Sequence, residues 1–309
     1  MGTAPRAGGW RPLLLATRGS PLALAQSRSV ADRLRAAGVD DDIELVVVKT
    51  TGDLSPDVPV ERLAGQGAFV REVQSALLDG RADLAVHSAK DLPSETPPGL
   101  VLACVPERAD PRDALVGSTL AGLPTGAAVA TGSVRRRAQL AWLRPDLTFT
   151  ELRGNMGIRL DRARQAGAGV LAYAALVRLG LAGEVSEVLD PLVMVPQVGQ
   201  GALAVECRQD DDRVLEMLAA VDDVGAHRAL LAERAFLGAL GGGCTLPAGA
   251  LARPGSDGAL TMEAMLASAD GHVLLRSSSE GEDPVSLGTG LADALLDGAG
   301  GRQLEDFRR

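Results

Sequence analysis

Arginines recur in this sequence where predicted strands give way to helices, a position suited to binding anions. Arg135 and Arg136 follow ATGS (residues 130–133), and Arg153 follows the next predicted strand. Guanidinium groups beside the exposed N–H groups of a helix start bind carboxylates or phosphates, and ligands of open α/β sheets bind beyond the carboxyl ends of strands. Any single arginine taken alone is best interpreted as a solvated residue in an ordinary ion pair. The repetition of arginines at successive strand ends nevertheless predicts one anion-binding crevice. The other arginines in such positions are Arg18, Arg159 and Arg178.

Asp91 is the candidate for proton transfer. It follows the strand pattern ADLAVHS (82–88), so its carboxylate is expected at the carboxyl end of a strand. Such a carboxylate can stabilise a developing positive charge and relay protons, or it can be a turn aspartate that bonds its own backbone. The neighbouring Lys90 would bind a substrate carboxylate and favour ionised Asp91. We interpret His87 as a satisfied strand residue and not as a base.

Cys244 stands in GGGCTLPAG (241–249), where glycines leave a thiol with little to cover it. It is either a free thiol in a turn or a reactive group, because reactivity usually decides the importance of a cysteine. The other cysteines, Cys104 and Cys207, lie far from it, no CxxC occurs, and the three histidines are scattered. Neither a disulfide framework nor a metal site is therefore expected.

Composition restricts the possible functions further. The 309 residues carry 31 Lys+Arg against 40 Asp+Glu, a net charge of −9, and 2% aromatic residues. An acidic chain with few stacking side chains is not expected to bind nucleic acid. The apolar run 13–16 is too short for a signal peptide or a membrane span, which predicts a cytoplasmic protein without membrane contact. GQGALA (199–204) matches a dinucleotide-binding pattern, but a strand pattern follows it where a helix would be required.

Apolar strands alternate with amphipathic helices as far as residue 181, which predicts largely parallel sheets covered by helices. Ser20 can cap the first helix, with Pro21 in its first turn. ERADPRDAL (107–115) is predicted to be a hinge between domains. The expected strands lie at 12–16, 43–53, 82–88, 100–106, 126–133, 147–155 and 169–176, and the expected helices at 21–38, 67–80, 134–143, 156–167 and 177–181.

After the strand ALAVECR (202–208) the pattern changes to that of a smaller α+β domain. The expected helices are 211–219, 224–240 and 284–296, and the expected strands are 245–252, 260–268 and 272–279. Asp270 and Gly271 predict a hairpin turn between the last two strands. No convincing internal sequence repeat is found.

Seven segments occur in an order that resembles the porphobilinogen deaminase family, also called hydroxymethylbilane synthases. They are ATRGSPLALAQ, KTTGD, HSAKDLP, GSVRRRAQL, ELRGNMGIRL, VGQGALAVECR and GGGCTLPAG. The resemblance runs from about Leu13 to the final helix. It implies two doubly wound α/β domains similar to periplasmic binding proteins, followed by a small C-terminal α+β domain. The implied domains are 12–106 with 198–216, then 107–197, then 217–309.

The resemblance also implies a reaction. Family members are transferases that join four porphobilinogen molecules head to tail with release of ammonia, giving the linear tetrapyrrole hydroxymethylbilane for porphyrin and heme biosynthesis. They use a covalent dipyrromethane cofactor, which Cys244 would hold through a thioether. The family precedent is a cytoplasmic monomer that passes its product to uroporphyrinogen-III synthase.

By the same resemblance Asp91 is the catalytic residue, stabilising pyrrole cations and assisting proton transfer. The residues that match cofactor- and substrate-binding positions of the family are Arg18, Ser20, Phe69, Lys90, Thr131, Ser133, Arg135, Arg136, Arg153, Arg159 and Arg178. Phe69 matches a position that stacks on a ring. Two residues depart from the family pattern: Gln66 replaces a common lysine and Gly132 a common serine. Arg137 has no assigned role.

Two other classes of protein fit parts of the pattern. A non-catalytic two-lobed protein that binds a small carboxylate would share the α/β organisation but would need neither Asp91 nor a glycine-framed Cys244. A ligand-sensing regulator would require a DNA-binding module, which the motifs and the net charge do not indicate.

Overall fold

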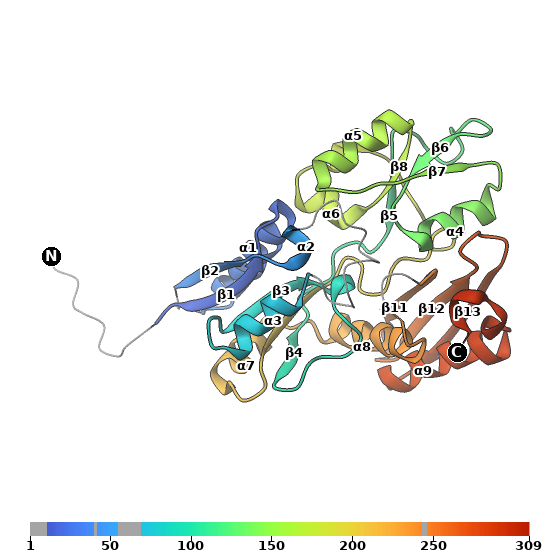
Figure 1. Cartoon of the computed structure of the whole chain (residues 1–309). Helices are drawn as coiled ribbons and strands as arrows, with labels where there is room; N and C mark the ends of the chain where they lie inside the picture. Colours follow the sequence, from blue (N-terminus) through green and yellow to red (C-terminus); the bar gives the residue numbers. More distant parts are fainter. Residues whose placement is uncertain (1–10, 40–41, 55–68, 243–245, 309) are drawn as a thin grey trace.

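The computed structural model describes residues 11–39, 42–54, 69–242 and 246–308. Figure 1 shows three units: two are built on five-stranded sheets and the third on a three-stranded sheet. We call the units lobe 1 (strands β1–β4 and β10 with their helices), lobe 2 (β5–β9) and the third unit (β11–β13). Within these described residues, no helix is long and apolar enough to span a membrane.

Lobe 1 has the strand order β2-β1-β3-β10-β4, in which only β10 runs antiparallel to its neighbours. Ser20 caps the first helix, because its Oγ accepts a hydrogen bond from the Ala23 N–H at 3.2 Å, and Pro21 opens that helix as predicted. The elements are β1 (Leu13–Arg18), α1 (Pro21–Ala36), β2 (Ile43–Val48), α2 (Thr51–Leu54), α3 (Arg71–Leu78), β3 (Leu84–Ser88), β4 (Leu100–Cys104), β10 (Leu203–Arg208) and α7 (Asp212–Ala219).

Helices cover both faces of this sheet. Val30 and Leu34 of α1 and Leu218 of α7 pack into one apolar cluster with the strands, and Val73 and Leu77 of α3 pack into another. This arrangement confirms the predicted doubly wound class for lobe 1.

Lobe 2 repeats the same plan with the order β7-β6-β8-β5-β9, in which β5 is the antiparallel strand. Leu140 of α4 packs on one face of the sheet, and Leu160 of α5 with Leu176 of α6 on the other. The elements are β5 (Asp113–Val116), β6 (Ala128–Ala130), α4 (Val134–Leu143), β7 (Thr148–Thr150), α5 (Met156–Ala166), β8 (Gly169–Ala172), α6 (Tyr173–Arg178) and β9 (Val185–Val188).

The two lobes are therefore alike in topology, although the sequence reveals no repeat. In each sheet the fourth strand in the order is antiparallel and belongs to a different part of the chain from its neighbours: β10 lies between β3 and β4, and β5 lies between β8 and β9. The chain crosses between the lobes twice, after β4 and again after β9. We call these segments the first crossover (105–112) and the second crossover (189–202).

The third unit is an antiparallel sheet, β11-β12-β13, against which α8 and α9 pack. Figure 1 shows α8 between this sheet and lobe 1. Its elements are α8 (Val224–Ala239), β11 (Ala248–Pro254), β12 (Leu260–Ala267), β13 (Leu274–Gly281) and α9 (Pro284–Asp293), which continues as a π-helical turn over Ala294–Gly298. These elements confirm the predicted small α+β domain.

Several expectations for lobe 2 were wrong. The helix expected over 177–181 is replaced by a turn after Arg178, because α6 begins and ends earlier in the chain. The strand expected over 169–176 ends at Ala172, and α6 begins at Tyr173, because Ala174, Ala175 and Leu176 are strong helix formers. Strand β5 was read as part of a hinge, and β9 was not expected at all. Both are short, and β9 shows no run of buried residues.

Candidate active site

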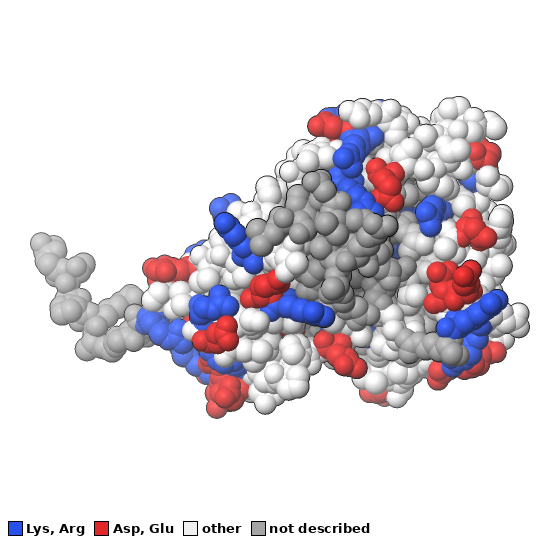
Figure 2. Space-filling model, viewed as in Figure 1, with Lys and Arg blue, Asp and Glu red and all other residues white. Residues whose placement is uncertain are grey.

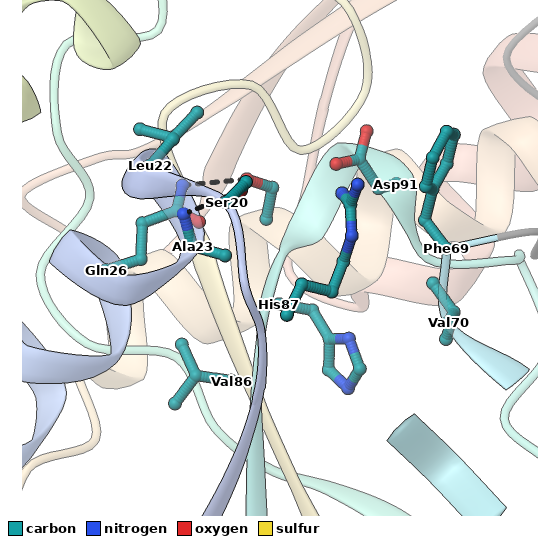
Figure 3. Close-up of a pocket in the computed structure, with 11 residues that line it drawn as sticks. Ser20, Leu22, Ala23, Gln26, Phe69, Val70, Val86, His87 and Asp91 are labelled. Atoms are coloured by element: carbon teal, nitrogen blue, oxygen red, sulfur yellow. Dashed lines mark hydrogen bonds between the residues drawn. The ribbon is translucent and has the colours of Figure 1, made fainter. Parts of the chain in front are cut away.

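A pocket in lobe 1 collects four of the predicted site residues. Arg18 ends β1, Ser20 caps α1, Phe69 precedes α3 and Asp91 lies in the turn after β3. Figure 3 shows Asp91 and Phe69 on the same side of this pocket, with Ser20 and α1 opposite. The remaining lining residues are Leu22, Ala23, Gln26, Val70, Val86, His87 and Ser88.

An arginine and an aromatic ring meet in this pocket. The guanidinium carbon of Arg18 lies 4.2 Å from the centroid of the Phe69 ring, which is a cation–π contact. His87 forms the floor of the pocket as a buried strand residue, as predicted, and its Nε2 lies 3.2 Å from Oε2 of Glu206 on β10. The pocket thus presents a flat ring face, a cation and a carboxylate.

Lys90 and Asp91 share a short 3₁₀ turn, Ala89–Asp91, that directly follows β3. Burial and, to a smaller extent, the positive charges of Arg136 and Arg159 together lower the pKa of the Lys90 ammonium to about 8, with Asp91 and Asp113 acting in the opposite direction. Because burial and neighbouring cations both disfavour the charged form of Lys90, a carboxylate ligand bound beside it would favour that form.

Arg135 and Arg136 begin α4 but point into the protein, where both pair with the fully buried Asp113. Arg135 donates Nη2–H to Asp113 Oδ2 at 2.8 Å, and Arg136 donates Nε–H to Oδ1 at 3.0 Å. Burial alone would raise the pKa of Asp113, but the two arginines and Gln200 hold it at about 2. Asp113 is therefore the counter-ion of the basic cluster at the base of lobe 2.

Arg136 extends beyond this pair toward lobe 1. Its Nη2 donates to Gln200 Oε1 at 3.4 Å, and its charge acts on both Lys90 and Arg159. Burial lowers the pKa of the Arg159 guanidinium, as does Arg136, while Asp91 raises it. The charges of Lys90, Asp91, Arg136 and Arg159, drawn from both lobes, therefore interact at one junction.

Thr131 and Ser133 build the turn before α4. Ser133 caps the helix by accepting from the Arg136 N–H, and the Thr131 hydroxyl accepts from the Ser133 N–H at 3.2 Å. Their hydroxyls thus shape the start of the helix that carries Arg135 and Arg136.

The other predicted arginines lie elsewhere. Arg153 is in the loop after β7 and pairs with the exposed Glu151 at 2.9 Å. Arg178 lies at the end of α6, and not directly after a strand as expected, and donates to the Gly201 carbonyl at 2.7 Å. Burial lowers the pKa of Arg178 to about 10, with a further contribution from Arg33. Arg135 is 2% exposed and is directed at Asp113 and the Val195 carbonyl.

The candidate cofactor anchor Cys244 and the departure Gln66 lie outside the residues that the structure describes. Gly132 is described. A side chain there would meet the backbone, because a Cβ would come 2.8 Å from the Leu152 carbonyl oxygen.

Several residues that organise the site were missed from the sequence. Asp113 and Gln200 connect the lobes, and Glu233 of α8 pairs with Arg108 of the first crossover, with 2.6 Å between Nη1 and Oε1. Gln200 stands in the GQGALA motif that failed as a nucleotide signature. Gln200 and Glu233 stand within apolar stretches, where a buried polar residue must find a partner inside the fold, and this was the available signal. Asp113 follows a charged segment and carries no such signal.

The surface charge agrees with this arrangement. Figure 2 shows basic and acidic side chains interspersed over most of this face, with basic groups reaching from the region of α5 toward its middle. Although the net charge of the chain is −9, Lys90, Arg136 and Arg159 lie close enough for their charges to interact.

The fold and the site define a two-lobed α/β protein with a basic junction and a carboxylate-bearing turn, suited to a ligand with several carboxylates. The chain belongs to the porphobilinogen deaminase family. Residues 13–216 match the porphobilinogen deaminase, dipyromethane cofactor binding domain, and residues 227–297 match the porphobilinogen deaminase C-terminal domain.

Curated relatives cover nearly the whole chain. The porphobilinogen deaminase of Roseiflexus sp. (strain RS-1) is 50% identical over 94% of this chain and 98% of its own length. That of Syntrophus aciditrophicus is 45% identical over 94% and 97%. Among solved structures, a nutrient binding protein from Burkholderia cenocepacia bound to methionine aligns with a TM-score of 0.41 and 13% identity, covering 69% of this chain and 92% of that one.

Proposed function

We propose that this chain is a hydroxymethylbilane synthase that condenses four porphobilinogen molecules head to tail, releasing ammonia, on a dipyrromethane cofactor bound to Cys244. Membership of the porphobilinogen deaminase family over almost the full length carries this conclusion. A non-catalytic carboxylate-binding protein is not favoured for two reasons. The chain belongs to a family of enzymes, and passive binding of a carboxylate would not require the Asp91 carboxylate in the pocket of Arg18 and Phe69.

The residues present fit a dipyrromethane group. A dipyrromethane carries acetate and propionate side chains, and the junction offers Lys90, Arg136 and Arg159 as cations to meet them. When bound, the group supplies a covalent primer whose terminal pyrrole accepts the next unit. Arg18, Ser20, Thr131, Ser133, Arg153 and Arg178 would complete the set of groups that hold the cofactor and the growing chain.

Asp91 supports the chemistry through its position. Loss of ammonia from porphobilinogen leaves a cation, and the half-buried carboxylate of Asp91 faces the same pocket as the Phe69 ring. A carboxylate fixed in place stabilises that positive charge and takes up the proton that each condensation releases. The Phe69 ring offers a face on which a pyrrole can stack.

Arg135 has a different role from the other arginines. Its guanidinium is directed at Asp113 and the Val195 carbonyl, both inside the protein. It therefore supports the site indirectly, by keeping Asp113 ionised and in place beneath Arg136.

We extend the proposal to organisation and context. The three domains are 12–106 with 198–216, 107–197 and 217–309. The protein acts in the cytoplasm as a monomer and passes hydroxymethylbilane to uroporphyrinogen-III synthase.

The test combines Ehrlich's reagent with the intact mass of the purified protein. We expect a pyrrole colour, a mass excess of two pyrrole units and consumption of porphobilinogen by the wild-type chain, all lost in Cys244→Ala. Cys207→Ala is the matched control, since Cys207 is a buried thiol in β10. An unmodified wild-type chain at its plain sequence mass would overturn the proposal.

A further inference from the structure

The Gly199-Gln200-Gly201 segment of the second crossover contacts both lobes and the third unit. The Gly199 N–H donates to Glu233 Oε2 of α8 at 2.7 Å, and the Gln200 carbonyl accepts from Arg108 of the first crossover at 3.0 Å. The glycines permit this closeness, because a Cβ on Gly199 would lie 2.9 Å from the backbone of Ala89 and Lys90, and one on Gly201 would lie 2.3 Å from the Ala109 oxygen. Both glycines also have positive φ.

The Gln200 side chain has a fixed orientation. Its Nε2 donates to Asp113 Oδ1 and to the Pro111 carbonyl, both at 2.8 Å. Because only the amide nitrogen can donate, these two acceptors determine which end of the amide is the oxygen. Gln200 is fully buried, so this orientation is held by packing as well.

The amide oxygen is thereby turned toward two cations from different lobes. Oε1 accepts from Lys90 Nζ at 3.5 Å and from Arg136 Nη2 at 3.4 Å. The Lys90 backbone is held from the same crossover, since Gln197 Nε2 donates to its carbonyl at 3.4 Å and the Ala89 N–H donates to the Ala202 carbonyl at 3.1 Å. The crossover therefore holds the turn that carries Asp91.

We propose that Gln200 is a positioning residue of the condensation reaction: its oriented amide keeps Lys90 charged and held at the junction of the lobes, ready for a pyrrole carboxylate. The inference rests on the proposed function. It gives a role to Gln200 of GQGALA (199–204), the motif that was rejected as a nucleotide-binding signature. Gln200 contacts no reacting atom in this scheme and acts through Lys90.

The charges around Lys90 determine the direction of the effect. Arg136 of α4 and Arg159 of α5 disfavour its protonated form, whereas Asp91 of its own turn and Asp113 of β5 favour it. An amide oxygen that accepts from the ammonium also favours the charged form. Gln200→Met removes that acceptor and should lower the pKa of Lys90 below about 8, while Gln200→Glu adds a negative charge and should raise it.

The chain allows this pKa to be measured without catalysis, because its only two lysines are Lys49 and Lys90. The lysines can be labelled competitively with acetic anhydride across a pH series, and the extent of acetylation can be read from peptide masses. The midpoint of the pH dependence of Lys90 acetylation gives its pKa, and the exposed Lys49 serves as an internal reference. We expect the Lys90 midpoint to move by roughly one pH unit, in opposite directions in the two variants. Gln209→Glu, an exposed glutamine of lobe 1, is the matched control and should leave it in place.

The alkaline limb of kcat/KM for porphobilinogen should follow the same shifts, since it reports the free enzyme. Opposite shifts support the proposal, because loss of stability alone would move both variants alike. Unchanged midpoints, or shifts in one direction in both variants, would overturn it. Should Gln200→Glu fail to fold, the downward shift in Gln200→Met decides alone. A wild-type chain that ignores porphobilinogen would overturn the proposed function while leaving the labelling result readable.

Discussion

Arg18 lies over the ring of Phe69, with 4.2 Å between the guanidinium carbon and the ring centroid. The two residues come from different elements, Arg18 from the end of β1 and Phe69 from the segment before α3. An aromatic face that accepts a flat cation also accepts a flat electron-rich ring or its cationic form. A pyrrole ring that stacks on Phe69 would therefore lie in the same pocket as the Asp91 carboxylate.

Replacing Phe69 should weaken ring binding specifically. Phe69→Leu removes the ring face while keeping an apolar side chain, and we expect kcat/KM for porphobilinogen to fall about 5- to 30-fold, the equivalent of about 1–2 kcal/mol. Phe69→Tyr keeps the ring and should retain most activity. Phe149→Leu, on β7 of lobe 2, is the control and should change kcat/KM little. Equal activity in Phe69→Leu and the wild type would argue against stacking.

Asp91→Ala should abolish turnover without affecting folding. The carboxylate is half-buried and fills no core volume, so the change removes charge stabilisation only. We expect steady-state turnover to fall at least about 100-fold and the melting temperature to stay close to that of the wild type. Asp79→Ala, an exposed acid at the end of α3, serves as the control. Substantial turnover by Asp91→Asn would remove Asp91 from the mechanism.

Arg136→Leu and Arg153→Leu should differ in stability although both impair elongation or cofactor assembly. Removing Arg136 leaves the buried Asp113 with Arg135 and Gln200 as partners, so the loss of stability should be smaller than the ~3–5 kcal/mol of a fully broken buried pair. The Arg153–Glu151 pair is largely exposed and contributes at most about 1 kcal/mol. Urea unfolding and the mass of partly elongated enzyme species measure the two effects. Full activity in both variants, with cofactor in place, would contradict the basic-junction assignment.

Asp113 should make stability depend on acid pH. Its folded pKa of about 2 lies below its ordinary value of 3.8, so its contribution is present above pH 4 and is lost as the pH falls toward 2. The shift corresponds to about 2 kcal/mol. Asp113→Asn should unfold more readily at neutral pH and lack this part of the acid slope. The check is denaturant unfolding at a series of pH values, where parallel curves for both proteins would refute the prediction.

Gly132→Ser should not improve this chain, although it would restore the residue that the family resemblance implies at this position. The new Cβ would lie 2.8 Å from the Leu152 carbonyl, so the backbone must move at the turn that leads to Arg135 and Arg136. We expect a lower melting temperature and reduced kcat/KM. Gly126→Ala tests a glycine with no neighbour near its Cβ position, where a positive φ alone is responsible for any loss. A gain in activity in Gly132→Ser would show that the turn adapts.

Much of the fold could be predicted because its signals are local. Ser20 with Pro21, and Ser133 before Val134, mark helix starts that the structure confirms. The apolar runs in 82–88 and 100–106 marked strands correctly. Strand β5 was missed because it begins with the polar Asp113 directly after a charged, proline-containing segment, and β9 was missed because its sequence VSEV has no run of buried residues.

The site was less predictable because its organisation depends on distant partners. The position of Asp91 at the end of a strand followed from the sequence, and the structure places it in the same pocket as Arg18 and Phe69. That Arg135 faces inward could not be foreseen, since its partner Asp113 lies 22 residues earlier and is fully buried. The bridge formed by Gln200 likewise requires both crossovers to be in place.

The insertion of β10 between β3 and β4 determines the order in which the chain can mature during synthesis. Strands β5 to β9 span residues 113–188 without interruption, whereas the sheet of lobe 1 lacks its fourth member until Leu203–Arg208 leaves the ribosome. Until then β3 and β4 of lobe 1 each have an unpaired edge, whereas lobe 2 already has all of its strands. Lobe 1, which is synthesised first, is thus completed only after lobe 2, and a nascent chain arrested before residue 203 would be the form most in need of a chaperone.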